Sequence, residues 1–488
     1  MGLSLKAERR IVGGFADSGS HETGHRLRDR SRFAEAKATV RVPVAIVGGG
    51  MAGLCAAWWL DKHRMRDYVV LEMERQAGGN SRWGEGEAGA YPWAAHYIPG
   101  PATGAGLVRE LLGELGLLQS DGTWEERHLC HSPQERLFIH GRWQDGLEPE
   151  LGSSRADREE YRRFQAKVEE AAASGEFRIP LETGACRRAD LDSVSFEAWL
   201  RREGFTSAAL HWYAGYACRD DYGAGAAAVS AWAGLHYFAA RRDAGDKGPL
   251  TWPEGNGWVA RRLIERVGPR LKTGEFIRRI ERAGNGWRVR GAGADYLADT
   301  VIFAAPQYLL PYLMDKAPAR AVPVYSPWLT ANLTLDRWPA ERGLPVAWDN
   351  VIYRSPALGY VVSTHQSLRT RIDRTVWTYY WALAEMEPAA ARRALLERDW
   401  HWWKEAVLTD LEQAHPDIRA CVSRVDIMRF GHAMARPAPG FLQRRGRTEI
   451  AGGFWLANSD ASGLSIFEEA QYRGVEAARR AMARLGGR

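Results

Sequence analysis

The 488-residue chain has few cysteines, and their spacing fits neither cross-links nor metal ligands. Five are scattered along it without a C-x-x-C pair: Cys55, Cys130, Cys186, Cys218 and Cys421. Because a disulfide framework or a zinc site needs paired, closely spaced cysteines, we expect neither, and no metal is predicted. The pattern is typical of a reducing compartment, and Cys55, inside a predicted helix, is expected to be a small core residue.

Long apolar runs are also missing. No run approaches the roughly 20 residues that a membrane-spanning helix needs, so stable membrane insertion is not expected. Twin arginines at Arg9 and Arg10 match one feature of an export signal, but the apolar stretch behind them ends at Ala16, too early for such a signal. The expected location is therefore cytoplasmic, and export by a degenerate twin-arginine signal is the alternative.

A clustered basic surface is lacking as well. The net charge is +6, but residues 1–41 hold nine Lys or Arg against five Asp or Glu, so the remaining chain is nearly neutral. Nucleic-acid binding needs a basic face, so nucleic acid is not an expected partner. Residues 1–41 are expected to form a basic N-terminal arm. Its stretch from His21 to Arg41 is polar and lacks periodicity, which predicts an extended segment on the surface.

Tryptophan, by contrast, is abundant. The chain contains 21 Trp, which favours an aromatic-lined interior or cleft. Its length predicts two domains, which need not be continuous in sequence.

The clearest motif is a glycine loop that follows an apolar run, Val42 to Val47. Residues 48–53 read Gly-Gly-Gly-Met-Ala-Gly and match G-x-G-x-x-G, and an apolar helix is predicted after them. In a dinucleotide fold Gly48 permits the tight turn, Gly50 lets the backbone approach a pyrophosphate, and Gly53 lets the helix pack on the strand. The helix N-terminus then offers free N–H groups to the phosphates.

A second β-rich run, residues 68–71, ends at Glu72. A carboxylate at this place accepts hydrogen bonds from a ribose diol and repels a 2′-phosphate, so it speaks against NADP.

Other elements are predicted from periodicity and turn residues. Helices are expected at 106–117, 158–173, 196–202 after the cap residue Ser195, 259–267 and 466–483; strands at 136–143 as a His-Gly hairpin, 271–280, 287–290 after an Asn-Gly turn, 299–306 and 377–381.

Four further sequence features carry a family resemblance. Leu71-Glu72 is followed by Gly78-Gly79-Asn80-Ser81, with Arg75 between; residues 92–97, 257–306 and 457–474 supply the other matching blocks. Together they resemble the FAD-dependent amine oxidase superfamily, which also holds phytoene desaturase-like and protoporphyrinogen oxidase-like enzymes. The resemblance covers the cofactor domain throughout and the rest of the chain only vaguely.

The resemblance implies FAD as cofactor and an α/β fold, in which a Rossmann-like FAD-binding domain of the glutathione reductase type is interleaved with a mixed α+β substrate domain. Behind the arm, residues 1–41, the FAD-binding domain would comprise 42–100, 255–310 and 441–488, and the substrate domain 101–254 and 311–440. The cofactor-binding residues it implies are Gly48, Gly50, Met51, Ala52, Gly53, Glu72, Arg75, Gly78, Gly79, Asn80, Ser81, Ala94, Ala95, His96, Tyr97, Ile277, Ala305, Asn458, Ser459, Asp460, Ile466 and Phe467.

The chain also departs from the family pattern. Asn80 replaces an arginine and Glu469 a glycine. Amine oxidases usually carry a lysine that holds a water near flavin N5, but the matching stretch, residues 325–333, has none. The nearest, Lys316, is expected on a surface turn and not as its equivalent.

Four side chains are candidates for the chemistry. His96 would lie at the flavin ring, where it could tune the flavin or take the amine proton, or simply pack. Tyr379 and Tyr380 should face opposite sides of a strand, so one of them could form half of an aromatic cage for an amine. His432 precedes the closing motif and could border the pocket.

A polar cluster, residues 218–222, has two interpretations. Its acids could attract a polyamine, or they could form a salt-bridged helix cap.

These features predict an FAD-dependent oxidoreductase that oxidises an amine, with a polyamine as one candidate, by hydride transfer to flavin N5. The expected partner is therefore a small-molecule amine. The first alternative is a phytoene desaturase-like C–C desaturase or isomerase, which would have an apolar substrate tunnel. The second is a flavoprotein that keeps FAD for structure and works as a binding partner.

Overall fold

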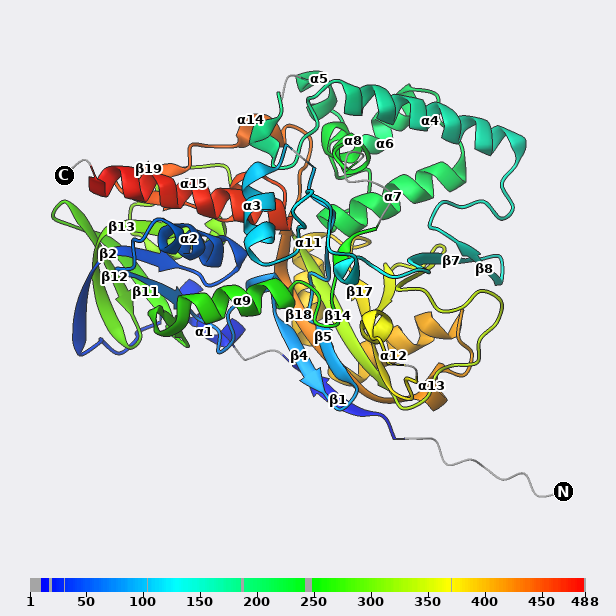
Figure 1. Cartoon of the computed structure of the whole chain (residues 1–488), viewed down its shortest axis with the longest axis horizontal. Coiled ribbons are helices and arrows are strands. Elements are labelled where there is room, and N and C mark those ends of the chain that lie inside the picture. The colour runs from blue at the N-terminus through cyan, green and yellow to red at the C-terminus, as the bar shows by residue number, and fades with distance from the viewer. Residues whose placement is uncertain are drawn as a thin grey trace.

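The computed structural model describes residues 10–16, 20–29, 31–102, 104–185, 188–241, 248–369 and 371–486. Arg9 and Cys186 lie outside these ranges, whereas Cys55, Cys130, Cys218 and Cys421 are buried free thiols. Two domains lie side by side, each built around its own sheet (Figure 1). In the described ranges, no helix is both long and apolar enough to cross a membrane.

The first, Rossmann-like domain has the sheet order β10-β3-β2-β13-β12-β11, with β20 beside β13 and β19 beside β20. Strands β10, β3, β2, β13 and β20 run parallel, and β11, β12 and β13 form an antiparallel meander. The strands are β2 (Ala38–Val47), β3 (Tyr68–Glu72), β10 (Leu271–Thr273), β11 (Ile277–Ala283), β12 (Gly286–Gly291), β13 (Ala294–Phe303), β19 (Glu449–Ala451) and β20 (Phe454–Leu456). Because three separated stretches of chain supply one sheet, the predicted interleaved α/β fold is confirmed.

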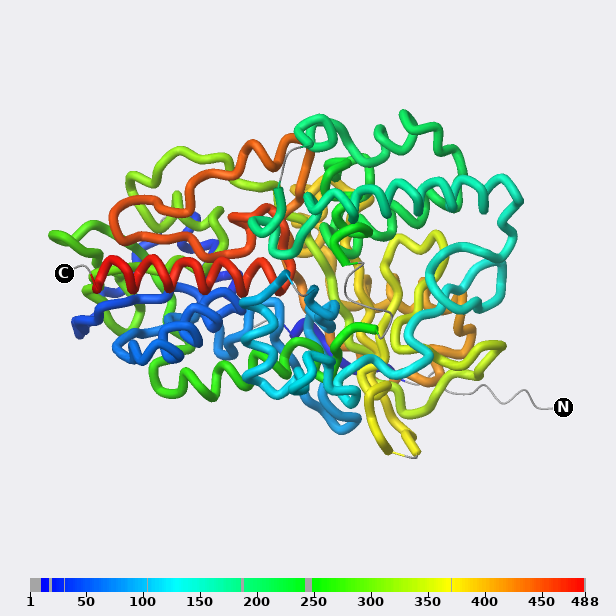
Figure 2. The backbone as a smooth tube through the Cα atoms, turned by 45° about the horizontal axis from the view of Figure 1, so that its top comes forward, coloured from blue at the N-terminus to red at the C-terminus, as the bar shows by residue number. Residues whose placement is uncertain are grey.

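The apolar run that opens the glycine motif forms the centre of this sheet. Both neighbours of β2 are strands, and its residues from Val44 to Val47 are buried, which is why the run is apolar without alternation. Helix α2 (Met51–Lys62) is buried from Met51 to Leu60. It packs with α9 (Gly257–Val267) and with the long α15 (Phe467–Gly486), which runs along the domain (Figure 2).

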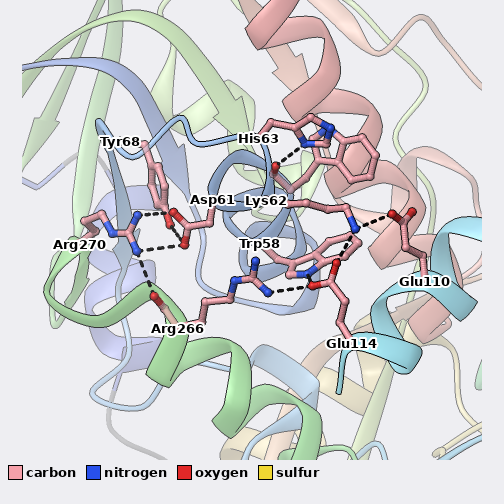
Figure 3. Close-up of polar contacts among 10 residues, drawn as sticks. Trp58, Asp61, Lys62, His63, Tyr68, Glu110, Glu114, Arg266 and Arg270 are labelled. Carbon is pink, nitrogen blue, oxygen red and sulfur yellow. Dashed lines mark hydrogen bonds and ion pairs between the residues drawn. The ribbon is translucent and has the colours of Figure 1, made fainter. Parts of the chain in front are cut away.

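Polar contacts fix the far end of α2 to its neighbours (Figure 3). Glu114, at the end of α3 (Gly106–Glu114), accepts hydrogen bonds from Trp58 Nε1 at 2.9 Å and Arg266 Nη1 at 3.0 Å, and pairs with Lys62. Asp61 pairs with both terminal nitrogens of Arg270 and accepts the Tyr68 hydroxyl at 3.0 Å. These contacts hold the helix whose other end is the glycine loop.

Replacing Asp61 with Asn should therefore weaken the Rossmann-like domain. The Asp61 side chain is only 8% exposed, and the neutral amide leaves the Arg270 guanidinium without its counter-charge. We expect a loss of about 1 to 3 kcal/mol in the free energy of unfolding, measured by urea titration followed by circular dichroism. Glu110→Gln, which removes the more exposed partner of Lys62, is the control and should cost under about 1 kcal/mol. Equal losses in the two variants would contradict this account.

The second, mixed-sheet domain has eight strands in the order β1-β18-β14-β17-β16-β15-β7-β8. They are β1 (Val12–Phe15), β7 (Glu135–Ile139), β8 (Arg142–Asp145), β14 (Tyr325–Leu335), β15 (Asp349–Ile352), β16 (Gly359–Val362), β17 (Thr375–Trp381) and β18 (Val422–Ala435). Many of its Trp and Tyr side chains, including Trp377 and Tyr360 stacked at 4.0 Å, are buried in its core. The abundance of tryptophan therefore reflects packing as well as the cavity described below.

A helical layer lies beside one end of this sheet (Figure 1). It comprises α4 (Arg155–Ala173), α5 (Ala189–Asp192), α6 (Phe196–Arg202), α7 (Ala208–Tyr222) and α8 (Ala231–Ala239). Further α-helices are α10 (Leu310–Leu313), α11 (Pro388–Glu397), α12 (Trp400–Glu412), α13 (Ile418–Cys421) and α14 (Phe441–Arg444). Two small sheets pair β4 (Trp83–Gly86) with β5 (Gly89–Pro92) and β6 (Tyr97–Ile98) with β9 (Leu250–Thr251).

Most of the predicted elements are confirmed. The hairpin turns at His140 and Gly141 with φ of 51° and 75°, and Ser195 caps α6 by accepting from Ala198 N–H. The predicted strand 271–280 is instead two strands, β10 and β11, separated by Gly274 at φ 69°.

The prediction for the N-terminal arm was wrong in part. Residues 12–15 form β1, which pairs in parallel with β18, and Ser20–Arg28 form a helix, α1. Leu27 of α1 is 8% exposed and belongs to the core around Ile277, and Phe33 packs on Phe276. A single buried side chain gives too weak a periodicity to be recognised in a nine-residue helix.

Candidate active site

A cavity of about 860 Å³ runs from the glycine loop to the mixed-sheet domain. Of the residues that sequence reasoning assigned to a cofactor, its wall contains Gly48, Gly50, Met51, Ala52, Glu72, Gly78, Gly79, Asn80, Ser81, Ala95, Ile277, Ala305, Asn458, Ser459, Asp460, Ile466 and Phe467. Gly53, Arg75, Ala94, His96 and Tyr97 are outside this wall. The arrangement brings the first, middle and last thirds of the chain to one cavity.

The three motif glycines differ in what their missing side chain would meet. A Cβ on Gly53 would lie 1.9 Å from Gly48 O, and Gly48 has φ of 106°, so the protein's own packing requires both glycines. Gly50 has an ordinary φ of −74°, and a Cβ there would meet only Gly79 Cα, at 3.8 Å. The bare backbone at Gly50, at the N-terminus of α2, is therefore explained by a ligand that approaches it, as a pyrophosphate does.

Glu72 stands beside this loop as a buried carboxylate. It accepts the Gly49 N–H at 2.7 Å and the Glu74 N–H at 2.8 Å. Burial raises the pKa of Glu72, and these two N–H groups oppose the rise. Each oxygen keeps a further lone pair for a ribose hydroxyl, and the charge disfavours a 2′-phosphate.

The wall also contains polar groups that sequence reasoning missed. Asn256 donates its N–H to Ala95 O at 3.0 Å, and its buried Oδ1 has no hydrogen-bond partner among the described residues. Arg82, which pairs with Glu74 at 3.5 Å, lines the cavity, whereas Arg75 is outside its wall. Asn256 precedes a glycine at the start of a helix, a signal too common to single it out. The unpartnered oxygen and the bare glycine fit a dinucleotide.

The closing motif is held in place by its own hydrogen bonds. Asp460 accepts from Gln307 N–H at 2.7 Å, from Gln307 Nε2 at 2.9 Å and from the Tyr325 hydroxyl at 2.6 Å. Asn458 Nδ2 donates to Ala304 O at 3.0 Å. Glu469, which replaces a family glycine, is buried and accepts from Ser462 and from the Leu181 N–H, so it joins α15 to the helical layer.

Helix α1 closes part of the cavity, which sequence reasoning did not predict. It contributes Ser20, His21, Gly24, His25, Leu27 and Arg28 to the wall. The Ser20 hydroxyl donates to Glu74, two residues from Glu72, and Leu27 packs in the core that contains Ile277. The helix therefore covers the side of the cavity where Glu72 and Ile277 lie.

A second cavity, of about 220 Å³, adjoins the first at the chain segment Ala95-His96. Ala95 lines the large cavity, and His96 and Tyr97 line the small one. Its wall combines aromatic side chains with carboxylates: Tyr97, Tyr216, Tyr237, Trp348, Glu135, Asp220 and Asp349. Among the described residues, no group of three His, Cys, Asp or Glu side chains is arranged to hold a metal ion.

His96 lines the small cavity as a neutral base, next in the chain to Ala95, which lines the large one. Its ring stacks on Tyr380 at 4.6 Å and tilts against Trp348 at 5.5 Å. Burial lowers the pKa of His96 to about 4. Nδ1 lies 3.3 Å from Ala94 O, so we assign the proton to Nδ1, which leaves Nε2 as a hydrogen-bond acceptor.

Comparison with known proteins gives the same picture. Residues 46–115 match the model of an NAD(P)-binding Rossmann-like domain. Wild-type putrescine oxidase bound to putrescine superposes with a TM-score of 0.70 at 19% identity, over 91% of this chain and 100% of that chain. The chain has the amine oxidase fold. The resemblance to the FAD-dependent amine oxidase superfamily is thus confirmed for the fold.

Other solved structures with the amine oxidase fold agree. Cyclohexylamine oxidase from Brevibacterium oxydans IH-35A gives a TM-score of 0.68 at 17% identity, over 91% of this chain and 99% of that chain. A putative protoporphyrinogen oxidase from Exiguobacterium sp. gives 0.64 at 15% identity, over 93% and 100%. No curated protein sequence matches the chain significantly.

In this amine oxidase fold the two tyrosines of β17 face opposite sides, as predicted. The Tyr380 hydroxyl donates to Ala94 O at 2.9 Å and its ring stacks on His96, so Tyr380 supports the chain segment that lines the site. The Tyr379 hydroxyl donates to Asp410 at 2.8 Å inside the core, away from both cavities. Tyr379 therefore belongs to the packing, and its proposed role in catalysis is not supported by its position.

Of the other residues that the sequence singled out, His432 lies at the large cavity and Lys316 does not. His432 lines the large cavity and stacks on Tyr308 at 4.3 Å; burial lowers its pKa to about 4. Lys316 is exposed on a turn, as predicted, and β14 has no lysine. On β14, Thr330 is opposite cavity-lining Met428 and site residue Tyr380, and its buried hydroxyl has no partner among the described residues.

Proposed function

We propose that this protein is an FAD-dependent oxidoreductase that oxidises an amine. The observation that carries the proposal is an aromatic wall of His96, Tyr380 and Trp348: His96 and Trp348 line the small cavity, and Ala95, the chain neighbour of His96, lines the large one. Solved proteins with this fold include oxidases of putrescine and cyclohexylamine, which supports an amine as the substrate.

The cofactor would accept the electrons, and the chain's residues would bind the cofactor and orient the substrate. Bound FAD would supply the electron acceptor, taking at N5 the hydride of a C–H bond beside a nitrogen and leaving an iminium ion. Gly48, Gly50, Glu72 and Asn256 would hold the dinucleotide, as their geometry indicates. The aromatic wall excludes water and orients the substrate carbon, since a neutral amine needs no further acid or base.

His96 would position the amine by accepting a hydrogen bond from it and would itself stay neutral. With a pKa of about 4 it stays neutral at physiological pH, and Nε2 accepts a hydrogen bond from the amine N–H. Tyr380 stacks on the His96 ring and donates to Ala94 O, which fixes the orientation of the imidazole.

The polarity of the small cavity favours an amine over the desaturase alternative. A hydrocarbon substrate would require an apolar tunnel, but Glu135, Asp220 and Asp349 line the space beside His96. Burying three carboxylates against a hydrocarbon would be costly, whereas they attract an ammonium group.

The test is the visible spectrum of the purified protein before and after anaerobic addition of a panel of amines. Flavin bands that bleach with an amine would support the proposal and identify the reactive class. A flavin that no amine reduces would contradict amine oxidation and favour a structural role. Protein that is colourless and does not bind added FAD would contradict the cofactor assignment.

His96→Ala should lower kcat/KM for the best amine by about 10- to 100-fold while the flavin stays bound. The rise of kcat/KM with pH should reflect deprotonation of the amine, because His96 is already neutral above pH 5 or so. Stopped-flow flavin reduction from about pH 6 to 9 measures both quantities. His96→Gln, which keeps an acceptor, should restore part of the rate. A limb of the profile that disappears in His96→Ala would contradict the neutral assignment.

We also propose that the protein acts in the cytoplasm. The segment that would follow the twin arginines supplies β1, which is paired with β18, whereas an export signal is removed. Fractionation of cells that produce the full chain tests this, and a shortened protein in an exported fraction would contradict it.

A further inference from the structure

The small cavity beside His96 is lined by carboxyl groups that no described basic residue pairs with. Glu135, Asp220 and Asp349 line it, and no described residue forms an ion pair with them. Arg241 in the same wall is paired with Asp221 at 2.6 Å. The next residues of the chain, 242–247, lie outside the described ranges, and their two basic residues are matched by two acidic ones.

The three carboxylates stand where local structure disfavours them. Glu135 and Asp349 are directly opposite each other at the start of the parallel strands β7 and β15, and like charges in that position destabilise a sheet. Asp220 is in the last turn of α7, where the helix dipole disfavours a negative charge. Glu135 is surrounded by protein atoms, but its side chain remains accessible to solvent because it faces the cavity. Residues placed against local preference around one cavity indicate a binding site.

Enclosure and mutual repulsion affect how these groups bind protons. Burial raises the pKa of Asp220 to about 7, and it raises the pKa values of Glu135 and Asp349. The charged groups that face them, besides one another, are Asp221 and Arg241 for Asp220, and Asp145 for Glu135. Tyr97 also donates to Asp220, at 3.3 Å. Near neutral pH the cluster therefore retains protons that a bound cation would displace.

The chemistry of the wall identifies the cation. The carboxylates do not converge as metal ligands do, since among the described residues no three such groups are arranged to hold a metal ion. The cavity is also walled by Tyr97, Tyr216, Tyr237 and Trp348, and aromatic rings attract an ammonium group and pack against methylenes. An ammonium group at the end of an apolar chain matches this wall.

We propose that Glu135, Asp220 and Asp349 bind a second, protonated amino group of the substrate, so that the enzyme acts on aliphatic diamines or polyamines. The amine to be oxidised then faces His96, and the distal ammonium lies among the carboxylates. The inference rests on the proposed function for its reaction, but binding of the dication can be tested separately.

The first experiment compares diamines with monoamines of equal length. Anaerobic flavin reduction of the holoprotein is measured with 1,4-diaminobutane against butylamine, and with 1,5-diaminopentane against pentylamine. We expect kcat/KM to be larger for each diamine by at least about tenfold. Equal values for diamine and monoamine would overturn the inference while leaving amine oxidation in place.

The variants Glu135→Gln, Asp220→Asn and Asp349→Asn test the residues. Each should lower the ratio of diamine to monoamine kcat/KM, by about tenfold for the strongest. The control Glu449→Gln removes an exposed carboxylate on β19 and should leave the ratio unchanged. Each cavity substitution relieves repulsion between the carboxyl groups, so we expect the thermal midpoint of each variant to stay the same or rise. A lower ratio without a lower midpoint then reports loss of binding and not loss of folding. A ratio that no cavity variant changes would overturn the assignment.

Calorimetry keeps the inference testable if no amine reduces the flavin. Titration of the holoprotein with 1,4-diaminobutane at neutral pH, in buffers of different ionisation enthalpy, should show binding and the release of protons. The variant that combines Glu135→Gln, Asp220→Asn and Asp349→Asn should show neither binding nor proton release. That result would support the dication site and contradict only the proposed oxidation. Absence of binding to the wild-type protein would overturn the site itself.

Discussion

Gly50→Asp should give a folded protein that contains no flavin. Gly50 is the residue before α2 and has a φ of −74°, and a Cβ added to it would have no atom closer than 3.8 Å, so the chain accepts a side chain there. Aspartate is also a better helix cap than glycine. Its carboxylate would nevertheless stand in the cavity wall where the pyrophosphate is expected, and the like charges would repel.

We expect the dissociation constant for FAD to rise at least about 100-fold, which corresponds to about 3 kcal/mol. Fluorescence titration of the apoprotein with FAD measures it, and the thermal midpoint of the apoprotein should not fall. Gly53→Ala is the informative contrast, because its Cβ would lie 1.9 Å from Gly48 O and should destabilise the fold itself. Normal flavin content in Gly50→Asp would show that the dinucleotide does not approach this glycine.

Removal of residues 1–29 should leave a protein that loses its flavin rapidly. The truncation deletes β1 and α1 and so uncovers the cavity beside Glu74 and Ile277. The remaining core is largely intact, since β1 is an edge strand of four residues and α1 buries only Leu27. Flavin dissociation should accelerate by about 100-fold or more, because loss of a covering element acts mainly on the off-rate.

The measurement is the release of flavin fluorescence after dilution of the holoprotein. Removal of residues 1–9 alone keeps both elements and serves as the control, with no change expected. Leu27→Asp should reproduce part of the effect by displacing α1 from its core. If the truncated protein holds flavin as tightly as the full chain, α1 is not a cover for the cofactor.

The cofactor half of the site could be predicted because its signals are local. The glycine loop, Glu72 and the apolar strand before the loop are contiguous in sequence, and the structure places them together as expected. The closing motif near Asp460 was recognisable in the same way. The sequence predicts Arg75 as a cofactor-binding residue, but Arg82 lines the cavity instead, because spacing alone does not show which arginine turns toward it.

The small cavity could be predicted only in part, because some of its residues meet only through the sheet. Glu135 and Asp349 are far apart in sequence and become neighbours through the pairing of β7 with β15. For the cluster at residues 218–222 the two interpretations divide between adjacent residues: Asp221 forms the ion pair with Arg241, and Asp220 faces the cavity. Side-chain direction in a helix end depends on what packs against it, which a single sequence does not reveal.

The pairing of β1 with β18 limits the order in which the mixed sheet can form during synthesis. Val12 lies opposite Arg424, so β1 has no partner until the chain has been synthesised through β18. The β1 edge of the mixed sheet can therefore form only late in synthesis, after the other strands of that sheet have been made.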